Sequence, residues 1–177
     1  MAVFDDLIRS IVSQQLSTTA AATIYKRFLN AFEKNENISA QILNKTLDEL
    51  RSLGLSYQKA GYIQNVVRHF DEYRLYETDW NKWSDEDIIH ELTKIKGVGK
   101  WTVEMILMFS LYREDVLPLD DLIIRNHMIS LYDVRSEKKQ LISDLTEIAE
   151  KWRPYRTYAC RYLWAAKDTQ FNINKEE

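Results

Sequence analysis

The stretch Leu92-Thr-Lys-Ile-Lys-Gly-Val-Gly-Lys-Trp-Thr102 decides the fold, because it sets two glycines two residues apart between two segments predicted to be helical. Glycine accepts positive φ and lets a backbone come close to a ligand. A helix that begins at Lys100 offers N–H groups and a positive dipole end, which bind phosphate without side-chain charge. Lys94 and Lys96 add local positive charge. The stretch predicts an anion-binding turn between helices; an ordinary turn with solvated lysines is the alternative.

The chain on both sides of this turn is predicted to be helical. Four glycines and two prolines in 177 residues are too few for a sandwich or barrel, which needs frequent turns. Apolar residues from Phe4 to Val12 follow helical spacing. Further helices are predicted over 18–32, 47–53, 56–73, 85–93, 100–112 and 119–132, with one capped by Ser136 and one opened by Pro154. The fold class is therefore all-α.

Composition excludes several functions and compartments. The single cysteine, Cys160, leaves no internal disulfide framework, thiolate zinc site or cysteine-held iron–sulfur cluster. Met1 leads into Asp5 and Asp6 rather than a basic signal segment, and no apolar run is long enough to span a membrane. A net charge of −3 requires any nucleic-acid contact to be local. We expect a cytoplasmic protein, associated with the nucleoid in a bacterium or nuclear in a eukaryote.

Four ordered blocks carry a resemblance to a known family. They are Leu7–Ser17, Leu53–Ala60, Lys96–Thr102 and Asp115-Val-Leu-Pro-Leu-Asp-Asp-Leu122. Together they resemble the helix-hairpin-helix (HhH-GPD) DNA glycosylase superfamily, in its 3-methyladenine DNA glycosylase II branch. The resemblance implies a single domain over 1–177 with an active-site cleft between two lobes. One lobe holds the hairpin over about 18–113; the other runs over about 114–177 and includes the N-terminal helix.

The resemblance also implies how the hairpin works. It would grip the DNA backbone through Lys96, Gly97, Gly99, Lys100 and Thr102. A structural Na⁺ or K⁺ would be held by the carbonyls of Thr93, Ile95 and Val98. No other cofactor is required.

By the same resemblance the catalytic carboxylate is Asp121. Its neighbour Asp120 would point about 100° away, so the two cannot share one role. From the local sequence alone, Asp120 would be the helix cap and Asp121 a first-turn residue. An ionised Asp121 would stabilise the oxocarbenium ion that develops as the glycosidic bond breaks, and would orient or deprotonate the attacking water.

Aromatic residues are expected to form the base pocket. Trp101, Met105, Met108 and Tyr112 share a helical stripe, and the last two would be core residues. The resemblance assigns Trp101 and Met105 to the pocket, with Trp164, which faces away from the apolar side of its own helix, as the base-stacking residue. Cationic alkylpurines stack well on indole. Family members that cut the strand have a lysine where this chain has Trp101, so no Schiff base is expected.

A polar loop completes the expected site. The resemblance assigns Gln15 as the wedge that fills the gap left by the flipped nucleotide, with Ser17 beside it in the minor groove. His69, His90 and His127 have no metal-like spacing and are predicted to be surface or helix-packing residues.

The function implied is excision of alkylated purines such as 3-methyladenine from damaged double-stranded DNA by a monofunctional, monomeric glycosylase without a membrane partner. Alternatives are a glycosylase for deaminated or oxidised bases, a non-catalytic hairpin DNA-binding module, and an α-helical scaffold. Asp121 and Trp164 discriminate, because a binding module needs neither.

Overall fold

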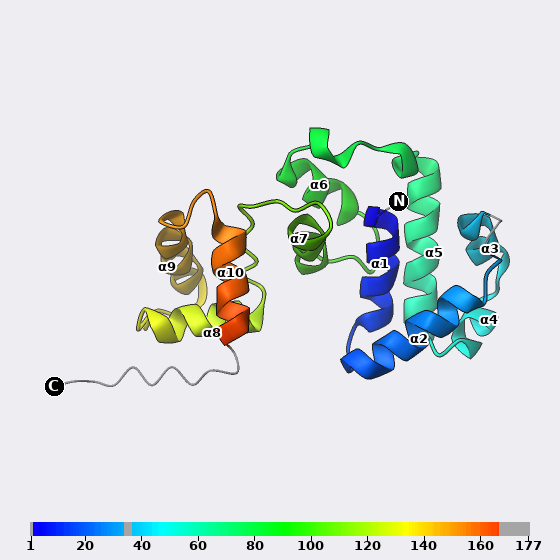
Figure 1. The fold of residues 1–177 in the computed structure, drawn as a ribbon, viewed down its shortest axis with the longest axis horizontal. Coiled ribbons are helices and arrows are strands. Elements are labelled where there is room, and N and C mark those ends of the chain that lie inside the picture. The colour runs from blue at the N-terminus through cyan, green and yellow to red at the C-terminus, as the bar shows by residue number, and fades with distance from the viewer. Residues whose placement is uncertain (1, 34–36, 167–177) are drawn as a thin grey trace. The chain divides into compact units, whose positions relative to one another are not determined.

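A computed structural model describes residues 2–33 and 37–166, and all regular secondary structure in these ranges is helical (Figure 1). The α-helices are α1 (Ala2–Ser13), α2 (Thr18–Asn30), α3 (Ile38–Asn44), α4 (Leu47–Ser52), α5 (Tyr57–Glu72), α6 (Asp85–Leu92), α7 (Lys100–Phe109), α8 (Leu122–Leu131), α9 (Lys138–Glu150) and α10 (Arg156–Ala165). Two 3₁₀ turns, η1 (Leu75–Glu77) and η2 (Trp80–Lys82), join α5 to α6. The all-α prediction is confirmed.

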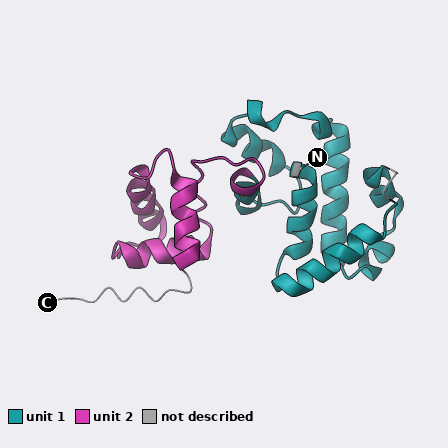
Figure 2. Ribbon diagram, viewed as in Figure 1, with its two compact units in different colours: residues 1–106 teal, residues 107–177 magenta. Residues whose placement is uncertain are grey.

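The chain divides into two compact units, residues 1–106 and 107–177 (Figure 2). These units differ from the two lobes expected from the sequence in their boundary and in the place of the N-terminal helix. The N-terminal helix α1 belongs to the first unit, because its apolar face packs on α2 and α5. Grouping α1 with the second lobe is therefore corrected.

The core of the first unit is built around α5, the longest described helix. Residues Ile63, Val66, Val67 and Phe70 of α5 are buried, as are Leu7, Ile11 and Val12 of α1. Aromatic contacts extend this core, since the ring of Phe4 lies 5.3 Å from that of Phe70. Fully burying one such apolar side chain contributes about 1.5–3 kcal/mol. This core holds α1 and α5 against each other.

The helices α6 and α7 form the predicted hairpin. Ser84 caps α6 by accepting a hydrogen bond from the Asp87 N–H, and α6 ends at Leu92. The α7 helix begins at Lys100 as predicted but ends at Phe109, three residues short of Tyr112. Tyr112 itself has a φ of 54°, outside any right-handed helix.

The second unit packs α8 against α10 and α9. Its core includes Ile124, Met128, Leu145 and Cys160. The α8 helix starts at Leu122 rather than Leu119, because the Asp121 N–H first closes a turn onto the Pro118 carbonyl at 3.0 Å. The α9 helix starts at Lys138, and Ser136 is not its cap.

Two absences hold within the described residues. None of their helices has the length and apolarity needed to cross a bilayer. No group of three or more His, Cys, Asp or Glu side chains there could hold a metal ion.

Candidate functional site

The two glycines of the hairpin have different structural roles. Gly97 has a φ of 108°, and a Cβ there would lie 2.2 Å from the Tyr62 ring. Gly97 is thus required by packing as well as by its backbone conformation. Gly99 lacks a positive φ, and nothing lies within 4 Å of where its Cβ would be. Gly99 is therefore the glycine at which an external ligand can approach the backbone.

The charged residues of the hairpin are partly paired. Lys94 contacts Glu91 at 2.6 Å, and Lys100 contacts Glu104 at 3.3 Å, where the Glu104 side chain is only 4% exposed. Lys96 is exposed. Thr102 is buried in the first turn of α7, where backbone N–H groups have no acceptor within the helix, and its contact with the DNA backbone stays a prediction.

The carbonyls expected to hold a cation lie in the same turn. Ile95 and Val98 are buried, and the Ile95 carbonyl accepts a hydrogen bond from the Val98 N–H at 3.0 Å. A carbonyl oxygen has two lone pairs, so Ile95 keeps one acceptor position. Neutral oxygen donors fit a hard cation such as Na⁺ or K⁺. Together with Thr93, the donor set is chemically suited to the expected ion.

The loop between α1 and α2 lies against the hairpin turn. The Gln14 side chain donates to the Gly97 carbonyl at 3.4 Å, although the two residues are far apart in sequence. Gln15 is exposed and has a φ of 58°. Ser17 is exposed, but its hydroxyl also caps α2 by accepting from the Ala20 N–H at 3.3 Å. The structure thus places residues 14–17, the predicted wedge loop, against the hairpin turn.

Asp121 is the N-cap of α8, and three N–H groups converge on its Oδ1 atom. They are the backbone N–H groups of Ile123 and Ile124, each at 3.0 Å, and Nε1 of Trp164 at 3.1 Å. Asp121 is only 9% exposed, whereas Asp120 is exposed. The capping role that local sequence favoured for Asp120 belongs to Asp121. The positive end of α8 also stabilises an anion there.

Trp164 is placed beside this carboxylate by α10. Besides donating to Asp121, its indole stacks on Phe109, with ring centroids 5.7 Å apart and ring planes 29° apart. Phe109 was not predicted as a site residue, although it lies four residues after Met105 on the same side of α7.

The predicted stripe on α7 is not uniform. Trp101 is 41% exposed and Met105 is half-buried. Met108 is buried, as expected of a core residue. Tyr112 is 79% exposed, so the prediction that it is a core residue is wrong. His69 packs between helices, with Nε2 at 2.8 Å from Glu91 and its ring 4.5 Å from Tyr73, which confirms a packing role.

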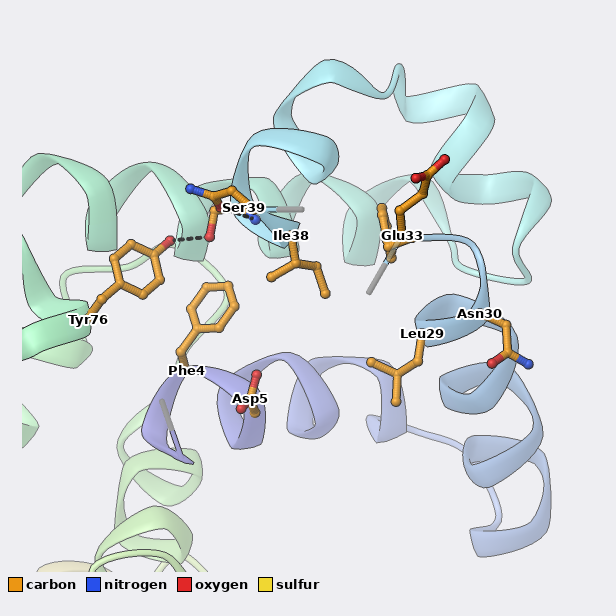
Figure 3. A pocket seen from close by; sticks show the side chains of 10 residues that line it. Phe4, Asp5, Leu29, Asn30, Glu33, Ile38, Ser39 and Tyr76 are labelled. Atoms are coloured by element: carbon orange, nitrogen blue, oxygen red, sulfur yellow. Dashed lines mark hydrogen bonds between the residues drawn. The ribbon is translucent and has the colours of Figure 1, made fainter. Parts of the chain in front are cut away.

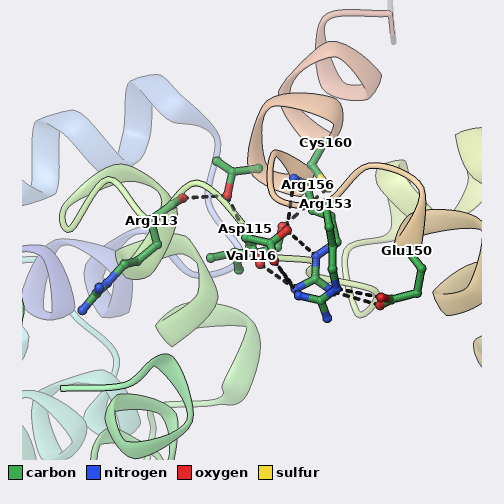
Figure 4. Close-up of polar contacts among 8 residues, drawn as sticks. Arg113, Asp115, Val116, Glu150, Arg153, Arg156 and Cys160 are labelled. Atoms are coloured by element: carbon green, nitrogen blue, oxygen red, sulfur yellow. Dashed lines mark hydrogen bonds and ion pairs between the residues drawn. The ribbon is translucent and has the colours of Figure 1, made fainter.

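An arginine–carboxylate cluster braces the second unit (Figure 4). Arg156, in the first turn of α10, donates to Asp115 Oδ1 at 2.7 Å and to the Asp115 carbonyl at 2.8 Å. Arg153 contacts both Asp115 and Glu150. Burial opposes ionisation of Asp115, but its hydrogen bonds and the charges of Arg156 and Arg153 hold the pKa of Asp115 below its usual value. No motif in the sequence indicated this cluster.

A cavity of about 870 Å³ lies elsewhere in the first unit (Figure 3). Figure 3 shows Phe4, Leu29 and Ile38 around it, with the Tyr76 hydroxyl 2.7 Å from that of Ser39. Burial is the main reason that the pKa of Tyr76 rises to about 12. None of the predicted site residues lines this cavity.

The structure combines a hairpin that turns at two glycines with an aspartate, Asp121, that caps a helix and accepts a hydrogen bond from Trp164. These features are those of a helix-hairpin-helix protein with a positioned carboxylate. Residues 8–154 match the HhH-GPD superfamily of base excision DNA repair proteins, and the chain belongs to this superfamily. The resemblance identified from the sequence is confirmed.

Solved structures and curated relatives agree with this assignment. The chain is similar to the Schizosaccharomyces pombe 3-methyladenine DNA glycosylase in complex with abasic DNA, with 34% identity, a TM-score of 0.75, and coverage of 92% of this chain and 79% of that chain. The chain is also similar to a DNA-3-methyladenine glycosidase from Bacillus halodurans, with 38% identity and a TM-score of 0.78. This match covers 94% of this chain and 76% of that chain. Schizosaccharomyces pombe DNA-3-methyladenine glycosylase 1 is 34% identical, over 91% of this chain and 71% of that protein. The chain spans 58% of a Bacillus subtilis relative.

Proposed function

We propose that this protein is a base excision repair DNA glycosylase that hydrolyses the N-glycosidic bond of alkylated purines, such as 3-methyladenine, in double-stranded DNA. The observation that carries the proposal is the Asp121 carboxylate, which is held at the start of α8 by three N–H donors. A hairpin alone needs no such group. Relatives named as 3-methyladenine DNA glycosylases support the choice of substrate.

The chemistry asked of Asp121 follows from the substrate. A purine alkylated on a ring nitrogen is already cationic, so its glycosidic bond needs little acid assistance. Positive charge develops on the sugar as the bond breaks, and a preorganised carboxylate stabilises it without reorganising. The same group can orient the attacking water or accept its proton. The convergent donors on Oδ1 fix the rotation of the carboxylate, which is what this role requires.

The aromatic residues suit a flipped cationic base. Trp164 presents an indole next to Asp121, and the ring of Phe109 stacks on that indole. A cation over an indole face gains about 0.5–2 kcal/mol. Trp101 and Met105, on the first turns of α7, are proposed as further pocket residues.

The reaction is proposed to stop at an abasic site. Strand cleavage by this superfamily needs an amine nucleophile, and an indole at position 101 cannot form a Schiff base. The nearby ammonium of Lys100 is engaged by the buried carboxylate of Glu104 at 3.3 Å. A lysine held in an ion pair with a carboxylate is a poor nucleophile.

DNA binding is proposed to rest on the hairpin and the neighbouring loop. Gly99 opens the backbone to a phosphate, and Lys96, Lys100 and the N–H groups of α7 supply positive potential. A Na⁺ or K⁺ on the carbonyls of Thr93, Ile95 and Val98 would add positive charge there when bound. Gln15 would fill the gap left by the flipped nucleotide. The protein is proposed to act as a monomer.

A panel of duplexes, each with one lesion, tests this function. Wild-type protein is incubated with DNA containing 3-methyladenine, hypoxanthine, 8-oxoguanine or no lesion, and products are analysed with and without alkali. We expect release of 3-methyladenine and strand breaks only after alkali. Breaks without alkali would contradict the hydrolytic mechanism, and no release from any duplex would support the non-catalytic binding module.

A further inference from the structure

One face of α5 holds both the wedge loop and the hairpin turn. Lys59, Tyr62 and Asn65 are spaced i, i+3 and i+6, so each is a neighbour of the next on the helix surface. Lys59 contacts the chain at the end of α1, and Asn65 and Tyr62 contact the hairpin turn. We propose that this face is a positioning platform that fixes the spacing of the two DNA-contacting segments, with Lys59 as the positioning residue for Gln15. The inference rests on the proposed function.

Lys59 controls the loop through backbone carbonyls. Its Nζ atom donates to the Val12 carbonyl at 2.8 Å and to the Gln14 carbonyl at 2.6 Å. These carbonyls lie at and just beyond the C-terminus of α1, where unsatisfied acceptors and the negative dipole end favour a cation. Burial lowers the pKa of Lys59. The contacts fix the residue immediately before Gln15.

Tyr62 and Asn65 control the hairpin turn in the same way. The Asn65 amide donates to the Lys96 carbonyl at 3.2 Å. The next residue, Gly97, lies against the Tyr62 ring closely enough that no side chain fits between them. The Gly97 carbonyl in turn accepts from the Gln14 side chain. The wedge loop and the hairpin turn are therefore tied to α5 and to each other.

The backbone at the wedge explains why such a platform is needed. Gln15 has a φ of 58°, a left-handed conformation that is unfavourable for a non-glycine residue and persists only where the surrounding structure holds it. Lys59 binds the carbonyl of Gln14, and Ser17 caps α2 on the other side. Gln15 is thus held exposed in one conformation before any DNA arrives. Preorganisation of this kind lowers the ordering cost of binding.

A double-mutant cycle tests the role of Lys59. Lys59→Met removes the donors and keeps most of the side-chain volume, and Gln15→Ala removes the wedge. The single variants and the double variant are compared with wild type for Kd on a duplex with a tetrahydrofuran abasic analogue and on the same duplex undamaged. Lys82→Met is the matched control, because the Lys82 side chain is 82% exposed and is paired with nearby Asp79. Circular dichroism and thermal melting check folding.

The account predicts that Lys59→Met weakens binding to the abasic duplex about tenfold and binding to undamaged duplex less than twofold. In the Gln15→Ala background, Lys59→Met should then have little further effect. Asn65→Leu, which acts on the hairpin, should add its full effect to that of Gln15→Ala. Equal losses on both duplexes, additivity of Lys59→Met with Gln15→Ala, or no loss would each overturn the inference. A wild-type protein that does not prefer the abasic duplex would instead overturn the proposed function.

Discussion

At the scale of single residues, Trp164 joins the proposed base pocket to the proposed catalytic carboxylate. Its indole N–H is one of three donors to Asp121 Oδ1, and its ring stacks on Phe109. These two roles can be separated by substitution. Phenylalanine keeps a ring for stacking and loses the donor, whereas alanine loses both.

We expect Trp164→Ala to reduce excision of cationic 3-methyladenine more than excision of neutral hypoxanthine, by up to about 30-fold in the ratio of rates, because only the charged base gains the cation–π attraction. Trp164→Phe should retain more of that ratio but slow both reactions, since Asp121 loses a donor. Single-turnover excision of both lesions by each variant is the measurement. Equal losses with alanine would leave Trp164 as a shape element only.

Residue roles were predictable from the sequence where a motif carried them. Asp121 and Gly99 were named from their blocks; Asp121 is the N-cap of α8 and Gly99 faces open space, and their roles in catalysis and DNA binding stay predictions. The donors to Asp121 were not predictable, because they depend on how α10 returns to the start of α8. Lys59 was also missed, since a lone lysine in a helix gives no sign that it will bind carbonyls 45 and 47 positions away.

At the scale of elements, the hairpin depends on two glycines for different reasons. Gly97 is confined by its φ of 108° and by Tyr62, whereas Gly99 faces open space. The sequence showed only a G-x-G pattern, which cannot reveal that one glycine packs on α5. A substitution at Gly97 should therefore affect mainly stability, whereas a substitution at Gly99 should affect mainly DNA binding.

Gly97→Ala is expected to lower the free energy of unfolding by roughly 2–4 kcal/mol, because the new Cβ overlaps the Tyr62 ring in a strained conformation. Gly99→Val should cost about 1 kcal/mol or less in stability and weaken binding to damaged and undamaged duplexes alike, about tenfold, by blocking the approach of phosphate. Urea unfolding and binding titrations on the same preparations measure both effects. A stable Gly99→Val variant with normal DNA binding would contradict the hairpin assignment.

Helix boundaries were predicted less well than helix existence. The sequence placed the start of α8 at Leu119, but the turn from Pro118 to Asp121 and the cap at Asp121 delay it to Leu122. Similarly, α7 was expected to reach Tyr112 and ends at Phe109. Apolar periodicity continues through such turns, so it cannot mark where hydrogen bonding changes.

At the scale of the whole molecule, the free energy of unfolding should depend on pH through a few carboxylates that form ion pairs. The pKa of Asp115 is held below its usual value by Arg156 and Arg153 despite burial, and that of Glu91 by Lys94 and His69 despite burial. When folding lowers the pKa of a carboxyl group, that group adds to the free energy of unfolding, and the full contribution is present at pH values above the pKa of the unfolded state. That contribution is lost as the pH falls through the lowered pKa.

Asp115→Asn should therefore cost about 1–3 kcal/mol at pH 7. The difference from wild type should shrink as the pH falls from about 4 toward 2. Chemical unfolding across pH 2–7 measures this, with Asp133→Asn as control because Asp133 and Arg135 form a pair that is exposed on both sides. A difference that stays constant over the whole range would show that Asp115 acts through packing rather than charge.

The central claim, that Asp121 is the catalytic carboxylate of a glycosylase, is tested most directly by single-turnover release of 3-methyladenine from a duplex. Asp121→Asn keeps the shape of the side chain and loses its charge, and Asp120→Asn is the matched control one residue away. The account predicts that Asp121→Asn lowers the rate by about 10²–10⁴ while binding to abasic-analogue DNA is largely retained, and that Asp120→Asn is near wild type. Near-wild-type turnover by Asp121→Asn, with Asp120→Asn inactive, would contradict it.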